Sequence, residues 1–419
     1  MSFPLLDQYR GLTAPVYVLA LARFMAAMGQ FVFPFLTLFL SSRMGMSDQQ
    51  ISYFLLATYV AMIVAAPWGG RLGDRHGRKK VYIILTLTGD ACFAAAGFLL
   101  ERPVTVALIM TGFFFIYSTG PVLSAMMMDL TPVERRQESF SLVYLGYNLG
   151  FAVGPLIAGL LFMEHTAWLF WGQALMGAAA LLLLALFIPA TKPGAAEFSA
   201  IAADPERRFE RPSEAPLLRQ LAADPRFVFF CLLNAMFAFS YSQMAYILPL
   251  DMSDIFGVAD GARYYGLVWS VNAGLVVLLT PLVVLASHRR PPLFNLIFAA
   301  CFYALGFGAN AWARSLPLIY GLALLWTLGE VCSFANGSVF LAGHAPASHR
   351  ARYQSVFEAM SAAGRAMGPL IMGRFLLGRS YNQGWLLAGA VCCLAAAGFV
   401  YLHLTEEKAQ SRAAAGDLA

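Results

Sequence analysis

Charged residues are scarce in this sequence. Asp, Glu, Lys and Arg make up 12% of its 419 residues, whereas a soluble globular domain carries roughly 25%. A chain this poor in charge has too little polar surface to cover a globule in water, which excludes the soluble protein classes. Hydrophobic residues form 59% of the chain. They come in blocks of about 20, the length that crosses the hydrocarbon core as a helix.

Signatures of several other protein classes are also missing. Residues 1–17 lack the basic region and small-residue cleavage site of a signal peptide, so we expect the first apolar block to be retained. The absence of a Walker loop argues against ATP-driven transport by this chain. The six cysteines lie in apolar blocks and the six histidines are scattered, so we expect no disulfide framework and no metal site. The sequence predicts no enzyme activity and no cofactor.

The apolar blocks predict an all-α membrane protein with twelve transmembrane helices in two six-helix, pseudo-symmetric bundles. The first bundle, residues 1–190, is predicted to span at 14–40, 50–70, 80–100, 104–128, 139–163 and 167–190. The second, residues 226–404, is predicted to span at 226–250, 263–285, 293–312, 316–341, 353–377 and 383–404. Residues 191–225 are predicted to be a cytoplasmic linker with a short surface helix at 214–223, and residues 405–419 a disordered cytoplasmic tail.

Orientation and internal symmetry follow from two further patterns. Most Lys and Arg residues fall in loops on one side of the predicted spans, which places both termini in the cytoplasm under the positive-inside rule. The fifth and eleventh spans repeat one motif 214 residues apart: Gly150, Gly154, Pro155 and Gly159 recur as Gly364, Gly368, Pro369 and Gly373. Parallel repeats of six spans are typical of secondary transporters.

The loop between the second and third spans has a specific composition. In residues 70–80 (GRLGDRHGRKK) the glycines permit a tight turn. Asp74 can meet the positive end of a neighbouring helix, and Arg78 can pair with Asp129 at the end of the fourth span. The alternative is a loop that is merely basic. The predicted conformational gate consists of Gly70, Asp74, Arg75, Gly77, Arg78 and Asp129.

The fifth span carries small residues at a spacing of four. Gly150 and Gly154 allow another backbone to approach closely, and Pro155 removes one backbone donor and bends the helix. Gly150, Gly154, Pro155 and Gly159 therefore form a predicted helix-packing motif. The alternative is an ordinary membrane packing face.

These two motifs resemble those of a known family. Residues 70–80 resemble the G-x-x-x-D-R-x-G-R-K-K loop of the major facilitator superfamily, and the motif at residues 150–159 resembles the antiporter signature of its drug:proton branch. The resemblance implies the major facilitator fold, a loop that controls the outward-open state, and a fifth span sealed against the eighth. The loop at residues 287–292 in the second half keeps the basic character but lacks the aspartate and glycines.

Five ionisable residues lie inside the predicted spans, where each costs a few kcal/mol and should face a cavity or a partner. Glu330, Glu358 and Asp90 are the predicted proton-coupling residues. Glu330 leads because residues 326–330 resemble the T-L-G-E string of some multidrug antiporters, where the glutamate contributes to coupling. The alternatives are a permanent pair of Glu330 with Arg23 or Arg365, a structural pair for Glu358, and a structural hydrogen bond for Asp90.

The fourth span departs from the family pattern. It lacks the arginine that many drug antiporters carry there, so Arg23 or Arg365 would have to replace it. The resemblance implies a substrate cavity lined by particular spans. The polar and aromatic candidates on them are Arg23, Gln30, Tyr144, Asn148, Tyr241, Gln243, Tyr246, Trp269, Asn272, Trp326 and Arg365.

The predicted function is therefore a proton-coupled antiporter that exports small lipophilic or cationic compounds by alternating access. The alternative is a carrier for one metabolite, such as a sugar, amino acid, siderophore or lysolipid. A multi-pass protein of the cell (inner) membrane is expected. Its partners would be the small-molecule substrate, protons and the lipid bilayer, with no nucleic acid, and it would act as a monomer.

Overall fold

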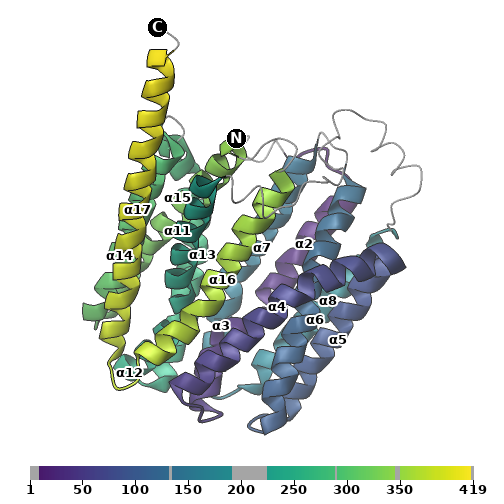
Figure 1. Ribbon diagram of the computed structural model, residues 1–419. Coiled ribbons are helices and arrows are strands. Elements are labelled where there is room, and N and C mark those ends of the chain that lie inside the picture. The colour runs from purple at the N-terminus through teal and green to yellow at the C-terminus, as the bar shows by residue number, and fades with distance from the viewer. Residues whose placement is uncertain (1–8, 132–134, 191–223, 288–289, 345–349, 417–419) are drawn as a thin grey trace, which may run out of the picture. The chain divides into compact units, whose positions relative to one another are not determined.

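The computed structural model describes residues 9–131, 135–190, 224–287, 290–344 and 350–416. Within these ranges the regular secondary structure is helical throughout (Figure 1). The predicted surface helix at residues 214–223 lies outside the described residues.

The chain folds into two compact units. The N-terminal unit comprises Met1–Glu197 and Leu248–Gly274, and the C-terminal unit comprises Phe198–Ile247 and Leu275–Ala419. Residues 248–274, which the sequence assigns to the second bundle, thus pack with the N-terminal unit.

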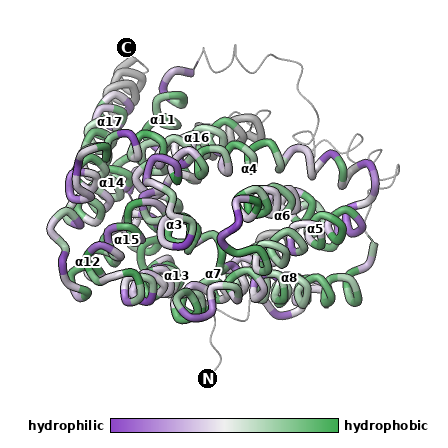
Figure 2. Tube along the Cα trace, turned by 90° about the horizontal axis from the view of Figure 1, so that it is seen from below, coloured by the Kyte–Doolittle hydropathy of each residue, from purple (hydrophilic) through white to green (hydrophobic). Residues whose placement is uncertain are grey.

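Seven helices lie in residues 9–190 of the N-terminal unit. They are α2 Ala14–Met28, α3 Val32–Ser42, α4 Asp48–His76, α5 Arg78–Phe98, α6 Pro103–Leu130, α7 Arg136–Leu161 and α8 Ala167–Phe187. Local sequence explains several starts. Ser47 and Gln50 form a capping box at the start of α4, and Pro103 supplies the first-turn proline of α6. Apolar residues predominate along α5 and α6 (Figure 2), as a lipid environment requires.

The remaining helices follow residue 224. They are α11 Pro225–Tyr241, the 3-10 turn η3 Ser242–Met244, α12 Ile247–Phe256, α13 Val258–Ser287, α14 Pro292–Gly308, η4 Ala309–Trp312, α15 Leu316–His344, α16 Arg350–Phe375 and α17 Tyr381–Gly416. The side chain of Asp224 caps α11 by accepting the Phe227 N–H at 3.0 Å. In the C-terminal unit, Trp326 and Trp385 both stack on Phe307, with centroids 5.4 and 6.4 Å away.

Eleven described segments are long and apolar enough to cross a membrane. The helix α16 has 26 residues and is also long enough, but charged residues such as Glu358 and Arg365 lower its mean hydropathy. These segments match the predicted spans in order and position, and they confirm the all-α membrane fold.

Two spans are interrupted in the structure, although the sequence predicts each as continuous. The first span, Ala14–Ser42, is broken between α2 and α3, and the seventh, Pro225–Phe256, is broken at η3. Backbone groups freed inside a bilayer must find partners within the protein. The Val32 N–H, at the start of α3, donates to Oε1 of Gln173 at 3.0 Å.

The end of α17 also differs from the expectation of a disordered tail. The helix continues to Gly416. Residues 405–416 are rich in Glu, Lys, Gln, Arg and Ala, which are strong helix formers even where no apolar face is available.

Candidate functional site

The loop between α4 and α5 is a single-residue turn. Gly77 ends α4 and begins α5 with φ +95°, a left-handed conformation that favours glycine. Arg78 then forms an ion pair with Asp129 of α6 and donates to the Ala125 carbonyl at 3.1 Å. The structure thus places these two predicted partners in contact. The side chain of Asp74 lies outside the described part of the molecule.

Glycines bring α4 close to α6 in the same region. A Cβ at Gly69 would collide with the Ser118 carbonyl, and one at Gly73 would lie 3.2 Å from Val122 Cγ2. The predicted gate residue Gly70 faces Pro121 at an ordinary 3.6 Å. The close contact between the helices therefore comes from Gly69 and Gly73, neither of which is among the predicted gate residues.

The small residues of α7 pack closely against two neighbouring helices, α2 and α13. Gly150 and Gly154 face α2, where a Cβ at Gly154 would lie 2.6 Å from the Met28 carbonyl. The fifth span does pack against the eighth as expected, but through Pro155 and Gly159 and not through Gly154. A Cβ at Gly266 of α13 would collide with the Pro155 carbonyl, and a Cβ at Gly159 would lie 3.0 Å from the Ala262 carbonyl of α13.

The repeat carries the same packing into the C-terminal unit. Gly364 and Gly368 of α16 face α11 and η3, so that a Cβ at Gly368 would lie 3.1 Å from the Phe239 carbonyl. The eleventh span thus packs on the seventh as the fifth packs on the first. The predicted cavity residue Gln243 is buried at this contact, where its Nε2 donates to the Phe239 carbonyl at 2.9 Å.

A cavity of about 150 Å³ lies in the N-terminal unit beside the break in the first span. This N-terminal cavity is lined by Arg23, Gln30, Phe33, Phe113, Ile116, Tyr117, Thr119, Gly120, Tyr147 and Gln173. The Arg23 guanidinium lies over the Tyr147 ring, 4.7 Å from its centroid. The Tyr147 hydroxyl donates to Oε1 of Gln30 at 3.2 Å. The structure therefore brings the predicted residues Arg23 and Gln30 together.

A larger cavity of about 440 Å³ lies in the C-terminal unit. This C-terminal cavity is lined by Asn234, Phe237, Ala238, Tyr241, Tyr303, Glu330, Ser333, Phe334, Phe357, Glu358, Ser361 and Arg365. It unites four predicted site residues: Tyr241, Glu330, Glu358 and Arg365. The Tyr241 hydroxyl donates to Oε1 of Glu330 at 3.1 Å. Among the described residues Arg365 forms no ion pair, so the permanent Glu330–Arg365 pair considered above is not observed.

Asp90 lies outside both cavity linings. Its side chain, 6% exposed on α5, packs against Gly177 of α8, where a Cβ would lie 2.6 Å from Asp90 Oδ1. Its Oδ2 is buried and has no hydrogen-bond partner among the described residues. The structural hydrogen bond expected for Asp90 is therefore not observed there.

The other predicted cavity residues lie elsewhere. Tyr246 and Trp326 are fully buried, and Asn272 is almost so. Trp269 is buried edge-on against Phe151, with ring centroids 5.4 Å apart. On α7, Tyr144 is 52% exposed and accepts Asn148 Nδ2 at its carbonyl. None of these side chains lines either of the two cavities.

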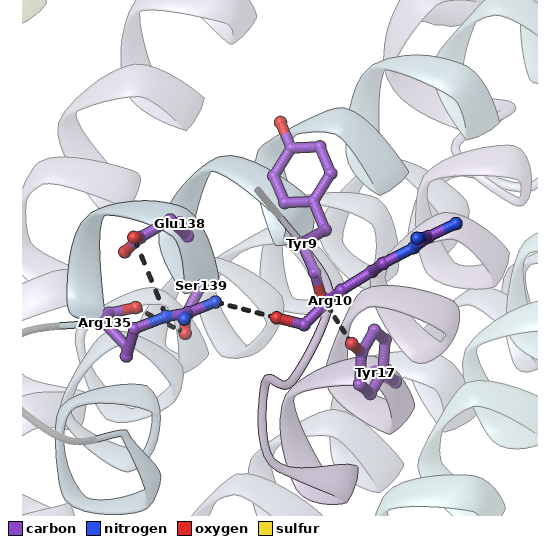
Figure 3. Close-up of polar contacts among 6 residues, drawn as sticks. All are labelled: Tyr9, Arg10, Tyr17, Arg135, Glu138 and Ser139. Carbon is purple, nitrogen blue, oxygen red and sulfur yellow. Dashed lines mark hydrogen bonds and ion pairs between the residues drawn. The ribbon is translucent and has the colours of Figure 1, made fainter. Parts of the chain in front are cut away.

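Polar contacts also tie the segment before α2 to the start of α7 (Figure 3). Arg135 donates to the Arg10 carbonyl at 3.0 Å and pairs with Glu138 at 3.7 Å. The Tyr17 hydroxyl donates to the Tyr9 carbonyl at 2.5 Å. These contacts join the ends of the two helices that carry Arg23 and Tyr147.

Membrane-length helices, two interrupted spans and cavities lined by polar residues of these spans are features of multi-pass membrane transporters. The comparison with known families agrees: the chain belongs to the Major Facilitator Superfamily, whose family model matches residues 19–369. Members of that family are transporters rather than enzymes.

Individual relatives are distant. The chain is 21% identical over 410 residues to a Na(+), Li(+), K(+)/H(+) antiporter of Planococcus maritimus, covering 90% of this chain and 93% of that one. It is 25% identical over 346 residues to the enterobactin exporter EntS of Shigella boydii, covering 78% and 77%. The crystal structure of the nucleoside transporter NupG matches with a TM-score of 0.72 at 15% identity, covering 93% and 99%. The structural match supports the fold alone.

Proposed function

We propose that this protein is a proton-coupled antiporter that exports small lipophilic or cationic compounds by alternating access. The observation that carries the proposal is the C-terminal cavity, where Glu330, Glu358 and Arg365 share one lining with aromatic residues. Ionisable side chains at membrane depth are costly, and their usual role is in ion or substrate pathways.

Glu330 is the proposed coupling group. The Tyr241 hydroxyl orients its carboxyl by a hydrogen bond to Oε1. Arg365 lines the same cavity without forming an ion pair among the described residues. A proton and a cationic substrate would compete for this carboxylate, and each shifts the transporter towards the state that binds it better.

The conformational change is assigned to the N-terminal unit's loop and packing motif. Residues 70–80 with the Arg78–Asp129 pair act as the gate, and the glycines of α7 hold α2 and α13 at close range. The names of the antiporter and exporter relatives favour antiport and export. The proposal places the protein in the cell membrane as a monomer with both termini in the cytoplasm.

Uptake of ethidium into inverted membrane vesicles under an imposed pH gradient tests this function. We expect accumulation by the wild type that a protonophore abolishes, and loss of it in Glu330→Gln. Glu164→Gln, the same change at an exposed residue outside the C-terminal cavity, is the matched control and should keep the wild-type rate. Accumulation that ignores the protonophore, or full activity in Glu330→Gln, would contradict the proposal.

A carrier for one metabolite is the second candidate, favoured by the enterobactin exporter among the relatives. Competition in the same vesicles separates the two functions. Several unrelated lipophilic cations should each reduce ethidium uptake by a multidrug antiporter. A carrier for one metabolite should be inhibited by one chemical class only.

A further inference from the structure

We propose that the N-terminal cavity binds an acidic aromatic group, a single ring bearing a carboxylate or an ionised phenol, with Arg23 as the anion-binding side chain. This inference rests on the proposed function and deepens it. It assigns to the transported compound an acidic ring in addition to a lipophilic or cationic part.

The depth of Arg23 in the membrane follows from its place in the first span. Arg23 lies nine residues beyond Ala14, the start of the first span, which is about 14 Å along a helix. The hydrocarbon core is about 30 Å thick, so the guanidinium belongs near its middle. An arginine at that depth needs an anion, water or an aromatic face. Its described interactions are with two tyrosines: the guanidinium lies over the Tyr147 ring, and its charge acts on Tyr82.

Side chains with unused N–H groups line the N-terminal cavity. Oε1 of Gln30 accepts the Tyr147 hydroxyl, and Oε1 of Gln173 accepts the Val32 N–H. Each amide oxygen thus already accepts one hydrogen bond. Among the described residues, the NH₂ groups of Gln30 and Gln173 and the guanidinium of Arg23 have no hydrogen-bond acceptor. These three unused groups are all donors, and donors select an acceptor-rich, anionic ligand.

The N-terminal cavity contains the positive charge of Arg23. No Asp or Glu is among the residues that line the N-terminal cavity. Asp90 of α5 lies outside this lining and packs against Gly177 of α8. The charge of Arg23 is therefore available to a ligand. The C-terminal cavity differs, because two carboxylates line it beside its arginine.

Aromatic rings form the walls of the N-terminal cavity. Phe33 and Phe113 meet edge to face, with centroids 5.8 Å apart, and Tyr147 faces Arg23. Aromatic walls favour a flat ring by stacking or edge contacts. A volume of about 150 Å³ is that of an apolar cavity known to hold one benzene ring. An acidic ring fills the aromatic part and presents its oxygens to the donors.

Binding of radiolabelled salicylate to the purified full-length protein in nanodiscs tests this inference, with empty nanodiscs as the baseline. Salicylamide, which has the same ring and no carboxylate, is the matched competitor. We expect saturable salicylate binding and at least about tenfold weaker competition by salicylamide, because hydrogen bonds to charged groups are worth roughly 1.5–3 kcal/mol. Arg23→Gln should weaken binding by about tenfold or more, and Arg23→Lys should restore part of it.

Arg102→Gln makes the same change at an exposed residue of the N-terminal unit and should bind like the wild type. No saturable salicylate binding, equal affinity for salicylamide, or wild-type binding by Arg23→Gln would each overturn the inference. An unchanged unfolding temperature shows that Arg23→Gln is folded. The assay uses no pH gradient, so failed binding with intact gradient-driven ethidium uptake refutes this inference alone. Salicylate binding without any gradient-driven uptake refutes the proposed function instead.

Discussion

The hydroxyl of Tyr241 donates a hydrogen bond to Oε1 of Glu330 across 3.1 Å and so joins α11 to α15. Tyr241 is the last residue of α11 before η3, so the bond lies where the seventh span is interrupted. A change in the charge or hydrogen bonding of Glu330 therefore acts directly on the residue that precedes η3, the interruption of that span.

Tyr241→Phe removes this hydrogen bond and keeps the ring. Because a hydrogen bond to a charged group is worth roughly 1.5–3 kcal/mol, we expect gradient-driven uptake into vesicles to fall about tenfold if the bond orients the coupling carboxyl. Tyr401→Phe, at a side chain that is 62% exposed in the same unit, should transport at the wild-type rate. Equal rates for the two variants would show that Tyr241 does not position Glu330.

The Arg78–Asp129 pair is only 12% and 13% exposed, so removing one partner leaves the other charge poorly solvated. Breaking a buried pair costs roughly 3–5 kcal/mol, and we expect Asp129→Asn to lose about 2–3 kcal/mol of stability. The double variant Arg78→Gln/Asp129→Asn should lose less than the sum of the single changes. Glu138→Gln, in the more exposed pair with Arg135, should cost at most about 1 kcal/mol. Thermal unfolding in detergent ranks the variants, and additive losses would contradict the coupling.

Gly150 allows the close approach of α7 to α2, where an added Cβ would collide with the Phe24 carbonyl and lie 2.9 Å from the Met28 nitrogen. Gly150→Ala must push the two helices apart, and overpacking of this kind costs about 1–3 kcal/mol. Gly274→Ala is the matched control, because no heavy atom lies within 4 Å of its Cβ position. It should unfold at the same or a higher temperature, since alanine is the better helix former. Equal unfolding temperatures for the two variants would argue against the close contact.

The spans could be predicted because apolar blocks of membrane length are separated by short polar loops. The two breaks could not, since residues 29–31 and 242–246 contain only glycine, neutral polar and apolar side chains, and hydropathy averages across them. The start of α3 depends instead on a tertiary contact. The Val32 N–H is satisfied by Gln173, which is 141 residues away in sequence.

The sequence could predict which charged residues of the site form a pair, but not which side chains packing buries. Arg78 and Asp129 could be paired because charged residues are so few. Trp326 was expected in a cavity, yet it is fully buried and stacks on Phe307, because a single sequence does not reveal which face of a helix meets its neighbours. Gln173 was missed because it lies in the sixth span, which is not one of the spans that the resemblance assigns to the cavity wall.

The carboxyl of Asp90 on α5 packs against Gly177 of α8. A Cβ at residue 177 would lie 2.6 Å from Oδ1 and 2.7 Å from Cγ of Asp90, so Gly177→Ala should lower the unfolding temperature. Asp90→Ala removes the colliding carboxyl, together with an oxygen that has no hydrogen-bond partner among the described residues.

The double variant Asp90→Ala/Gly177→Ala should therefore unfold at a higher temperature than Gly177→Ala alone, because the new methyl group occupies the vacated space. The four proteins form a double-mutant cycle measured by thermal unfolding in one detergent. Interaction free energies for residues in contact are about 0.5–3 kcal/mol. A cycle that closes with no interaction would mean that the carboxyl of Asp90 does not rest on Gly177.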